Sequence, residues 1–269
     1  MTVTAKYLYK EEMEVAEQAA REAGSIIMGL FKGSYDVQEK SKNNPVTSAD
    51  LAANRKICEI IRGRFPRDGW LSEEDKDSSE RLRASRVWIV DPIDGTKEFI
   101  EGVPQFAVSI GFVVDGRPQA AVVFNPAQDQ FYQAAAGQGA TLNGRPIHVT
   151  QRDQIDGALL LVSRSEPRKK FQVFVDRCAI EPVGSIAYRL AQVAGGKGDG
   201  TLTFRSIREW DVCAGVLMVE AAGGSVVDGN GKVLMFNQPE ARHRGVVAAN
   251  PILAKGLQGL WAKAMAEQP

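Results

Sequence analysis

An apolar run that ends on two acids, Asp91 and Asp94, constrains this chain more than any other feature of its sequence. The segment WIVDPIDGTKEFI begins with the apolar residues of a buried strand. Pro92 restricts one backbone dihedral and has no N–H, so the chain has to turn where the strand ends, and Gly95 permits the sharp continuation. We therefore expect both carboxylates to point toward one place.

Carboxylates that converge repel each other unless one is protonated or a cation lies between them. The carbonyl of Ile93, between the two acids, is expected to turn the same way, and hard oxygen donors of this kind suit Mg²⁺. With Glu73 and Asp211 added, the oxygens are enough for two Mg²⁺ ions about 3.5 to 4 Å apart, a separation typical of phosphoryl displacement. The implied substrate class is a phosphate ester.

Thr96 follows these acids and is placed to hold the attacking water beside the metal, passing its proton toward Asp50. Plainer interpretations stay open for several of the acids. Asp50 follows Thr47 in the T-x-x-D spacing of a capping box, and Asp211 opens a helix, where a carboxylate favours the macrodipole. The stretch LSEEDKDSSE, taken alone, is typical of a solvated charged loop.

The first part of the chain predicts helices. Apolar residues recur at helical spacing from Tyr9 to Phe31. A second helix is expected to begin at Thr47 or Ser48, whose hydroxyls can cap free amides, and to end at Gly63.

Strands dominate the middle of the chain, where FAVSIGFVV and PQAAVVFNP flank a turn and predict a hairpin. After about residue 150 strands alternate with helices, one of them expected over RKKFQVFVDRC. The pattern predicts a mixed α and β chain with two packed subdomains, residues 1–150 and 151–269.

Charge and composition exclude several classes of function. Lys plus Arg (33) equals Asp plus Glu (33), so no global field directs the chain toward nucleic acid or an anionic membrane. No window approaches 18 uninterrupted apolar residues and no signal peptide is evident, which predicts a cytoplasmic protein. The cysteines and histidines form no disulfide or zinc pattern; they are Cys58, Cys178, Cys213, His148 and His243.

DPIDGT preceded by WIV, the upstream LSEED, and EWD heading a helix with EAAGG resemble the inositol monophosphatase superfamily of Mg²⁺-dependent, lithium-sensitive phosphatases. The extension GTKEF, with SRS (Ser163 to Ser165) and PVTSAD, is similar to the 3'(2'),5'-bisphosphate nucleotidase branch. That branch removes the 3'-phosphate of adenosine 3',5'-bisphosphate to give AMP. The resemblance covers nearly the whole chain. It implies an α+β fold, the layered α-β-α-β-α sandwich of the inositol monophosphatase and fructose-1,6-bisphosphatase type, usually as a homodimer.

The resemblance also implies roles for individual residues. The ligands of two or three Mg²⁺ ions would be Glu73, Asp91, the Ile93 carbonyl, Asp94 and Asp211. The catalytic residues would be Asp50, Thr96 and Glu73. Substrate would contact Gly95, Thr96, Lys97, Arg164, Gly184, Ser185 and Asp211. Among these, the backbone amides of Gly95 and Thr96 would bind the phosphate.

The chain departs from the family pattern in KSKNNPVT, where Lys42 replaces an expected Asp and Asn44 replaces Ser. The loop that carries a third metal in such enzymes is therefore expected to differ. Lys40, Lys97, Arg164 and the basic run Arg168 to Lys170 are candidates to meet a second substrate phosphate, because a doubly charged group needs a cation to offset its desolvation. For Arg168 to Lys170 the plainer interpretation, ordinary solvated cations, stays open.

These observations predict a Mg²⁺-dependent phosphomonoesterase acting on adenosine 3',5'-bisphosphate. The alternative is an inositol monophosphatase or a broader sugar-phosphate phosphatase on the same metal site. A rival from another class, a phosphate or nucleotide sensor without turnover, would gain nothing from a water-activating pair such as Thr96 and Asp50.

Overall fold

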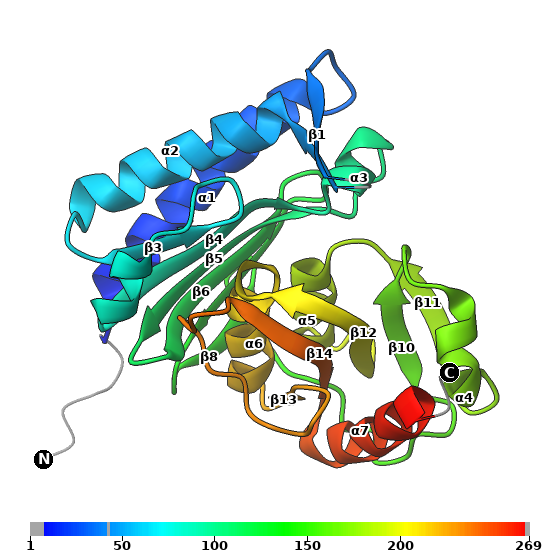
Figure 1. The fold of residues 1–269 in the computed structure, drawn as a ribbon. Coiled ribbons are helices and arrows are strands. Elements are labelled where there is room, and N and C mark those ends of the chain that lie inside the picture. The colour runs from blue at the N-terminus through cyan, green and yellow to red at the C-terminus, as the bar shows by residue number, and fades with distance from the viewer. Residues whose placement is uncertain (1–7, 42–43, 267–269) are drawn as a thin grey trace, which may run out of the picture.

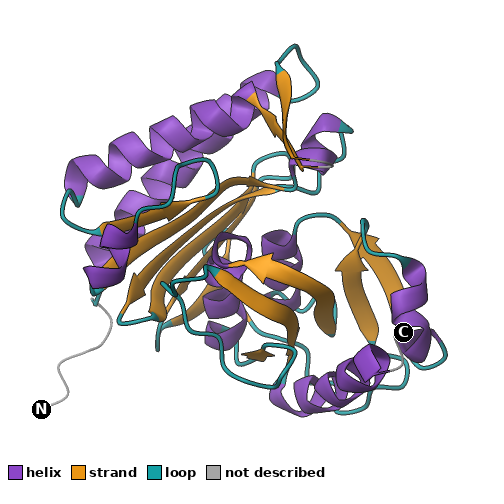
Figure 2. Ribbon diagram, in the orientation of Figure 1, coloured by secondary structure: helices purple, strands orange, loops and turns teal. Residues whose placement is uncertain are grey.

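Five alternating layers of helices and sheets make up the molecule (Figure 1, Figure 2). The structure is a computed structural model that describes residues 8–41 and 44–266. Helices form the two outer layers and the middle layer: α1 (Lys10–Leu30) and α2 (Ser48–Arg64), then α5 (Ile186–Ala194) and α6 (Glu209–Ala221), then α4 (Gln172–Val175) and α7 (Pro251–Ala266). The sheets lie between them, so the predicted α-β-α-β-α sandwich is confirmed.

The larger sheet has seven strands in chain order, with β3 parallel to β4 and every later neighbour antiparallel. Its strands are β3 (Gly69–Ser72), β4 (Arg86–Asp94), β5 (Ala107–Val114), β6 (Arg117–Asn125), β7 (Gln130–Ala135), β8 (Gly139–Leu142) and β9 (Arg145–Ile147). The predicted hairpin of β5 and β6 is confirmed.

Both faces of this sheet are buried, which explains the continuous apolar run before Asp91. In β4, Trp88 and Val90 pack with α1 and α2, whereas Val87 and Ile89 belong to the core shared with α5 and α6. Successive side chains of a strand point to opposite faces, so a strand with helices on both sides needs apolar residues at every position.

The smaller sheet has five strands in the order β11-β10-β12-β14-β13. They are β10 (Leu159–Ser163), β11 (Ala179–Val183), β12 (Gly200–Arg208), β13 (Ser225–Val227) and β14 (Arg242–Ala249). β10 is parallel to β11 and β12, and β14 is antiparallel to β12 and β13. A separate core that includes Phe174, Phe204 and Trp261 joins its outer face to α4 and α7.

Three local predictions differ from the structure. The second helix continues one residue past Gly63 to Arg64. The helix expected over 168–178 is divided into the 3-10 turn η3 (Arg168–Phe171) and the single turn α4, consistent with the weak helix propensity of its aromatic and β-branched residues. The short hairpin of β1 (Val37–Ser41) and β2 (Asn44–Thr47) was not predicted, because its polar residues give no apolar alternation.

The predicted boundary near residue 150 falls between β9 and β10, the point where the chain passes from one sheet to the other. α6 nevertheless packs closely on the larger sheet: a Cβ added at Gly111 of β5 would lie 2.6 Å from the Sγ of Cys213. The division into subdomains 1–150 and 151–269 stays a prediction. None of the helices in the described part of the chain is both long and apolar enough to cross a bilayer.

Candidate metal centre and active site

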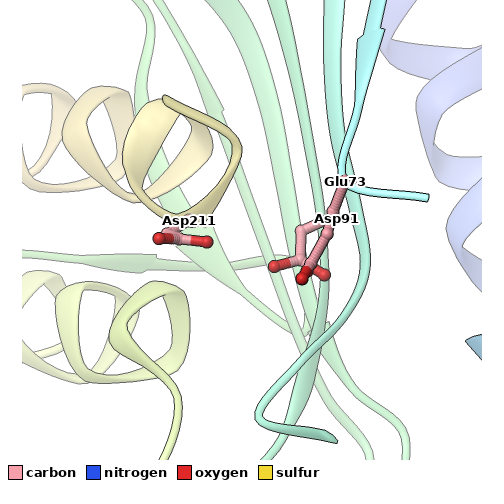
Figure 3. Close-up of side chains that lie close together, drawn as sticks. All are labelled: Glu73, Asp91 and Asp211. Carbon is pink, nitrogen blue, oxygen red and sulfur yellow. The ribbon is translucent and has the colours of Figure 1, made fainter. Parts of the chain in front are cut away.

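Three acids from distant segments converge at the carboxyl end of β4. Glu73 follows β3, Asp91 lies in β4, and Asp211 is in the first turn of α6; each offers a carboxylate oxygen within 4.8 Å of the others (Figure 3). Parallel pairing of β3 with β4 aligns Ser72 with Val90, and the Glu73 amide donates to the Val90 carbonyl at 3.2 Å. This pairing is what places Glu73 beside Asp91.

Asp94 borders the same cleft, but its carboxylate is directed to α5. The Oδ2 atom of Asp94 accepts hydrogen bonds from Ser185 Oγ and from the Ala187 amide, both at 2.6 Å. The pairing of β4 with β5 is irregular between Asp91 and Asp94, which separates the directions of the two side chains. The structure therefore brings Glu73, Asp91 and Asp211 together and leaves Asp94 beside this group.

Burial makes the group electrostatically unfavourable without a cation. Burial, followed by the charges of neighbouring acids, raises the pKa of Asp91 and of Asp211 well above the ordinary aspartate value. Burial also raises the pKa of Asp94 to about 6, although the bonds from Ser185 and Ala187 oppose the shift. A divalent cation offsets this repulsion, and carboxylate oxygens are ligands that Mg²⁺ prefers. The residues present fit such an ion.

Asp50 both closes the capping box of α2 and contacts Thr96, the two roles that its position in the sequence allowed. Its Oδ2 accepts from the Thr47 amide at 2.8 Å and from Thr47 Oγ1 at 2.5 Å, which forms the capping box of α2. Its Oδ1 accepts from Thr96 Oγ1 at 2.9 Å. Thr96 Oγ1 also lies 3.2 Å from the Ile93 carbonyl oxygen. Burial raises the pKa of Asp50, so this carboxylate is a better proton acceptor than an exposed aspartate.

Lys40 reaches the acids from the hairpin of β1 and β2. Its Nζ lies 2.7 Å from Glu73 Oε1 and 2.8 Å from Glu74 Oε1. Burial raises the pKa of Glu74 to about 7 despite the Lys40 charge. The predicted difference at Lys42 falls outside the described residues.

Two adjoining cavities lead to the acids. The first, of about 370 Å³, is lined by Glu73, Asp91, Thr96 and Lys97 among others. The second, of about 260 Å³, is lined by Gly184, Ser185 and Arg189. Both are bordered by Asp94, Gly95, Glu98, Ser165, Arg205 and Asp211.

Two predicted substrate residues have clear backbone requirements. Gly95 has φ +101°, and a Cβ there would lie 3.0 Å from the Gln105 carbonyl oxygen, so the turn after Asp94 requires glycine. The Gly184 amide donates to Gln105 Oε1 at 2.9 Å, and a Cβ at Gly184 would lie 2.3 Å from Glu98 Cγ. Both glycines border the cleft while allowing close packing beneath it.

Ser185 and Arg164 make contacts within the protein. Ser185 caps α5 by accepting from the Tyr188 amide at 3.0 Å. Arg164 pairs with Glu98 at 3.5 Å and with Glu101 at 3.0 Å. The structure thus places Arg164 against α3 (Thr96–Ile100), the helix that follows the acids.

Sequence reasoning missed two arginines at the cleft. Arg189 is buried in α5, and burial lowers its pKa to about 10. Arg205 is exposed near the end of β12, six positions before Asp211. A cation just upstream of an acid that begins a helix was the available signal, but the same spacing is common on solvated surfaces.

Residues 9–268 match the model of the Inositol monophosphatase family. This chain belongs to the inositol monophosphatase family. Nus factor SuhB of Escherichia coli (strain K12) is 32% identical over 259 residues, which cover 91% of this chain and 93% of that protein. Inositol monophosphatase 3 of Solanum lycopersicum is 34% identical over 230 residues, covering 81% of this chain and 86% of that protein.

Solved structures agree with the family in fold. The Thermotoga maritima IMPase aligns with a TM-score of 0.85 at 28% identity, covering 97% of this chain and 99% of that chain. The extragenic suppressor protein suhB from Bartonella henselae aligns with a TM-score of 0.84 at 29% identity, covering 94% of this chain and 99% of that chain. The family supports a metal-dependent phosphatase acting on small phosphorylated substrates. Inositol monophosphatase 3 and the Thermotoga maritima IMPase are named as inositol monophosphatases, and none of these four relatives is named as a bisphosphate nucleotidase, so the nucleotidase branch stays a prediction.

Proposed function

We propose that this chain is a Mg²⁺-dependent phosphomonoesterase, with an inositol phosphate or a related sugar phosphate as its first candidate substrate. The observation that carries the proposal is the convergence of Glu73, Asp91 and Asp211 within 4.8 Å of one another. The hydroxyl of Thr96, which is hydrogen-bonded to Asp50, borders the same cavity. A metal group beside a hydroxyl and a buried carboxylate is suited to hydrolysis of a phosphate ester.

In this proposal Glu73, Asp91 and Asp211 hold the metal, with Asp94 and the Ile93 carbonyl at its border. When bound, Mg²⁺ would neutralise the charge on the phosphoryl oxygens and stabilise the displacement. The amides of Gly95 and Thr96, together with Lys97, orient the phosphate.

Thr96 orients the attacking water, because its hydroxyl is held between Asp50 Oδ1 and the Ile93 carbonyl. The proton released by the water moves through the Thr96 hydroxyl to Asp50. Burial raises the pKa of Asp50, which makes it a better acceptor of this proton than an exposed aspartate would be. Glu73, at the same end of the cleft, is also proposed to take part in catalysis.

Adenosine 3',5'-bisphosphate is the second candidate substrate. Besides the GTKEF segment, a specific feature of the site favours it: the exposed cation of Arg205 borders both cavities. A second phosphate would require such a group.

The test is phosphate release from inositol 1-phosphate, fructose 1,6-bisphosphate and adenosine 3',5'-bisphosphate, with Mg²⁺ and with a chelator in its place. We expect Mg²⁺-dependent turnover of at least one ester. A tenfold difference in kcat/KM, about 1.4 kcal/mol of transition-state preference, decides between the two substrate classes. Binding without phosphate release from any ester would favour the sensor.

Several finer properties stay predictions: two or three Mg²⁺ ions per chain, inhibition by Li⁺, a homodimer, and a cytoplasmic location. Sedimentation of the purified chain tests the oligomeric state, and assays across a Li⁺ series test the inhibition.

A further inference from the structure

Two arginines make contacts at the turn after β10, and they differ in whether a carboxylate pairs with them. In this turn, Ser163 to Ser165, the Arg164 guanidinium is neutralised by Glu98 and Glu101. Ser165 instead holds a second guanidinium: Arg205 donates to Ser165 Oγ at 3.2 Å and to the Ser165 carbonyl at 2.7 Å. Within residues 8–41 and 44–266, no carboxylate lies within ion-pairing distance of the Arg205 side chain.

The backbone beneath Arg205 is built to direct its side chain. The pairing of β12 with β14 is irregular between Thr203 and Ser206, and such bulges re-aim side chains. Buried Glu166 fixes this bulge, since its Oε1 accepts from the Phe204 amide at 3.2 Å and from the Arg205 amide at 3.3 Å. The exposed guanidinium therefore stands on a rigid base, which reduces the entropy lost when it binds a ligand.

Arg205 lies where it can contact the part of a substrate that is away from the reacting phosphate. Arg205 borders the cavity that contains Glu73 and Asp91, and it also borders the second cavity. The second cavity is lined by neither of these two acids, but its lining includes Asp94, Glu98, Glu166 and Asp211. A substrate whose phosphate lies at the acids would extend into this second cavity. Of the positively charged residues described, Arg205 is the one that lines both.

We propose that Arg205, oriented by Ser165, binds a second phosphate of the substrate and makes the enzyme select bisphosphorylated over monophosphorylated esters. This inference rests on the proposed phosphatase function. A guanidinium has five N–H donors in a planar fork, and Ser165 accepts from two of its nitrogens. The remaining donors match the oxygens of a phosphate.

The experiment compares two matched substrate pairs that differ by one phosphate. They are adenosine 3',5'-bisphosphate with adenosine 3'-monophosphate, and inositol 1,4-bisphosphate with inositol 1-phosphate. Wild-type enzyme is expected to prefer the bisphosphate of at least one pair by about 10- to 100-fold in kcat/KM, the range for hydrogen bonds to charged groups. Arg205→Gln should reduce that preference to less than about threefold and leave the monophosphate rate within about threefold of wild type.

Arg164→Gln is the matched control, because the same change is made at the neutralised arginine of the same turn; it should keep the preference. Arg205→Lys, which retains charge without the fork, should recover only part of it. Equal preference in wild type and Arg205→Gln, or an equal fall on both members of a pair, overturns the inference.

Calorimetric binding of the two adenosine nucleotides separates this inference from the proposed function. Tighter binding of the bisphosphate that depends on Arg205, without phosphate release, would refute the phosphatase and retain the second-phosphate site. Equal binding of both nucleotides by wild type refutes the site, whether or not turnover is seen.

Discussion

The two walls of the cleft differ in what holds them in place. The acid wall, made of Glu73, Asp91 and Asp211, is set into strand and helix ends, and burial raises the pKa of both aspartates. A second wall of the same cleft, made of Ser165 and Arg205, is exposed. Buried like charges destabilise a fold, so a protein keeps them where its function requires them, whereas an exposed arginine is compatible with many functions. The acid wall therefore identifies the chemistry, and the exposed wall is where substrate preference is set.

Asp91→Asn should produce the largest effect of the single changes considered. It removes a charge from the proposed metal ligands with little change in size, and we expect kcat/KM to fall by at least about 100-fold, since changes at outer partners of metal ligands already cost about 10- to 100-fold. Metal-free stability should stay level or rise, because a buried repulsion is lost. Assays at saturating Mg²⁺ with thermal unfolding measure both.

An exposed acid provides the control for that change. Asp115→Asn, in the turn between β5 and β6, should leave both quantities unchanged, because asparagine tolerates the positive φ of 48° found there. Normal turnover of Asp91→Asn would remove the distinction between the two walls.

Thr96→Val should have the next largest effect. It deletes the hydroxyl that donates to Asp50 while keeping the β-branched shape, so we expect kcat to fall by about 100-fold, as for loss of a positioned proton-transfer group. Thr96→Ser, which retains the hydroxyl, should stay within about tenfold of wild type. If the valine and serine variants are equally active, Thr96 has only a structural role.

The extent to which Mg²⁺ stabilises the folded chain should depend on pH, and this is the smallest of the three expected effects. The pKa of Asp94 is raised to about 6 in the folded chain, above its ordinary value, so the folded chain holds protons that the unfolded chain has released. Metal-free stability therefore falls as pH rises from about 4 to about 6. Mg²⁺ binds the carboxylate form, so the rise in Tm at saturating Mg²⁺ should be about 5 °C or more near pH 7.5 and smaller near pH 5.

Thermal unfolding with and without Mg²⁺ at the two pH values measures this difference, and Asp91→Asn serves as the variant in which it should be lost. An equal rise in Tm at both pH values would show that Mg²⁺ does not compete with protons for the acid wall.

Local sequence was sufficient for the parts of the fold that have strong periodic signals. The apolar run before Asp91 predicted β4, and the Thr47 and Asp50 spacing predicted the start of α2. The hairpin of β1 and β2 and the strand β3 were missed, because short polar or edge strands form through pairing with neighbours. The position of Glu73 depends on one of these missed pairings.

Substrate-side residues were harder to predict than acids. Lys97 lines the cleft as expected, whereas Arg164 pairs with Glu98 and Glu101. Nothing local distinguishes Arg164 from Arg205, since both are exposed cations near strand ends. Which of them is neutralised depends on α3, which is distant from both in sequence.

By itself, the sequence determined that a buried strand ends on acids beside Thr96, and that this chemistry suits a divalent metal and a phosphate ester. The tertiary structure alone decided which acids meet, since Asp94 turns to α5 while Asp211 joins Glu73 and Asp91. It also decided that Arg205 faces the cleft with its charge uncompensated. The physical reason is range: dihedral limits and apolar periodicity act between near neighbours, whereas charge pairing and convergence depend on segments that only folding brings together.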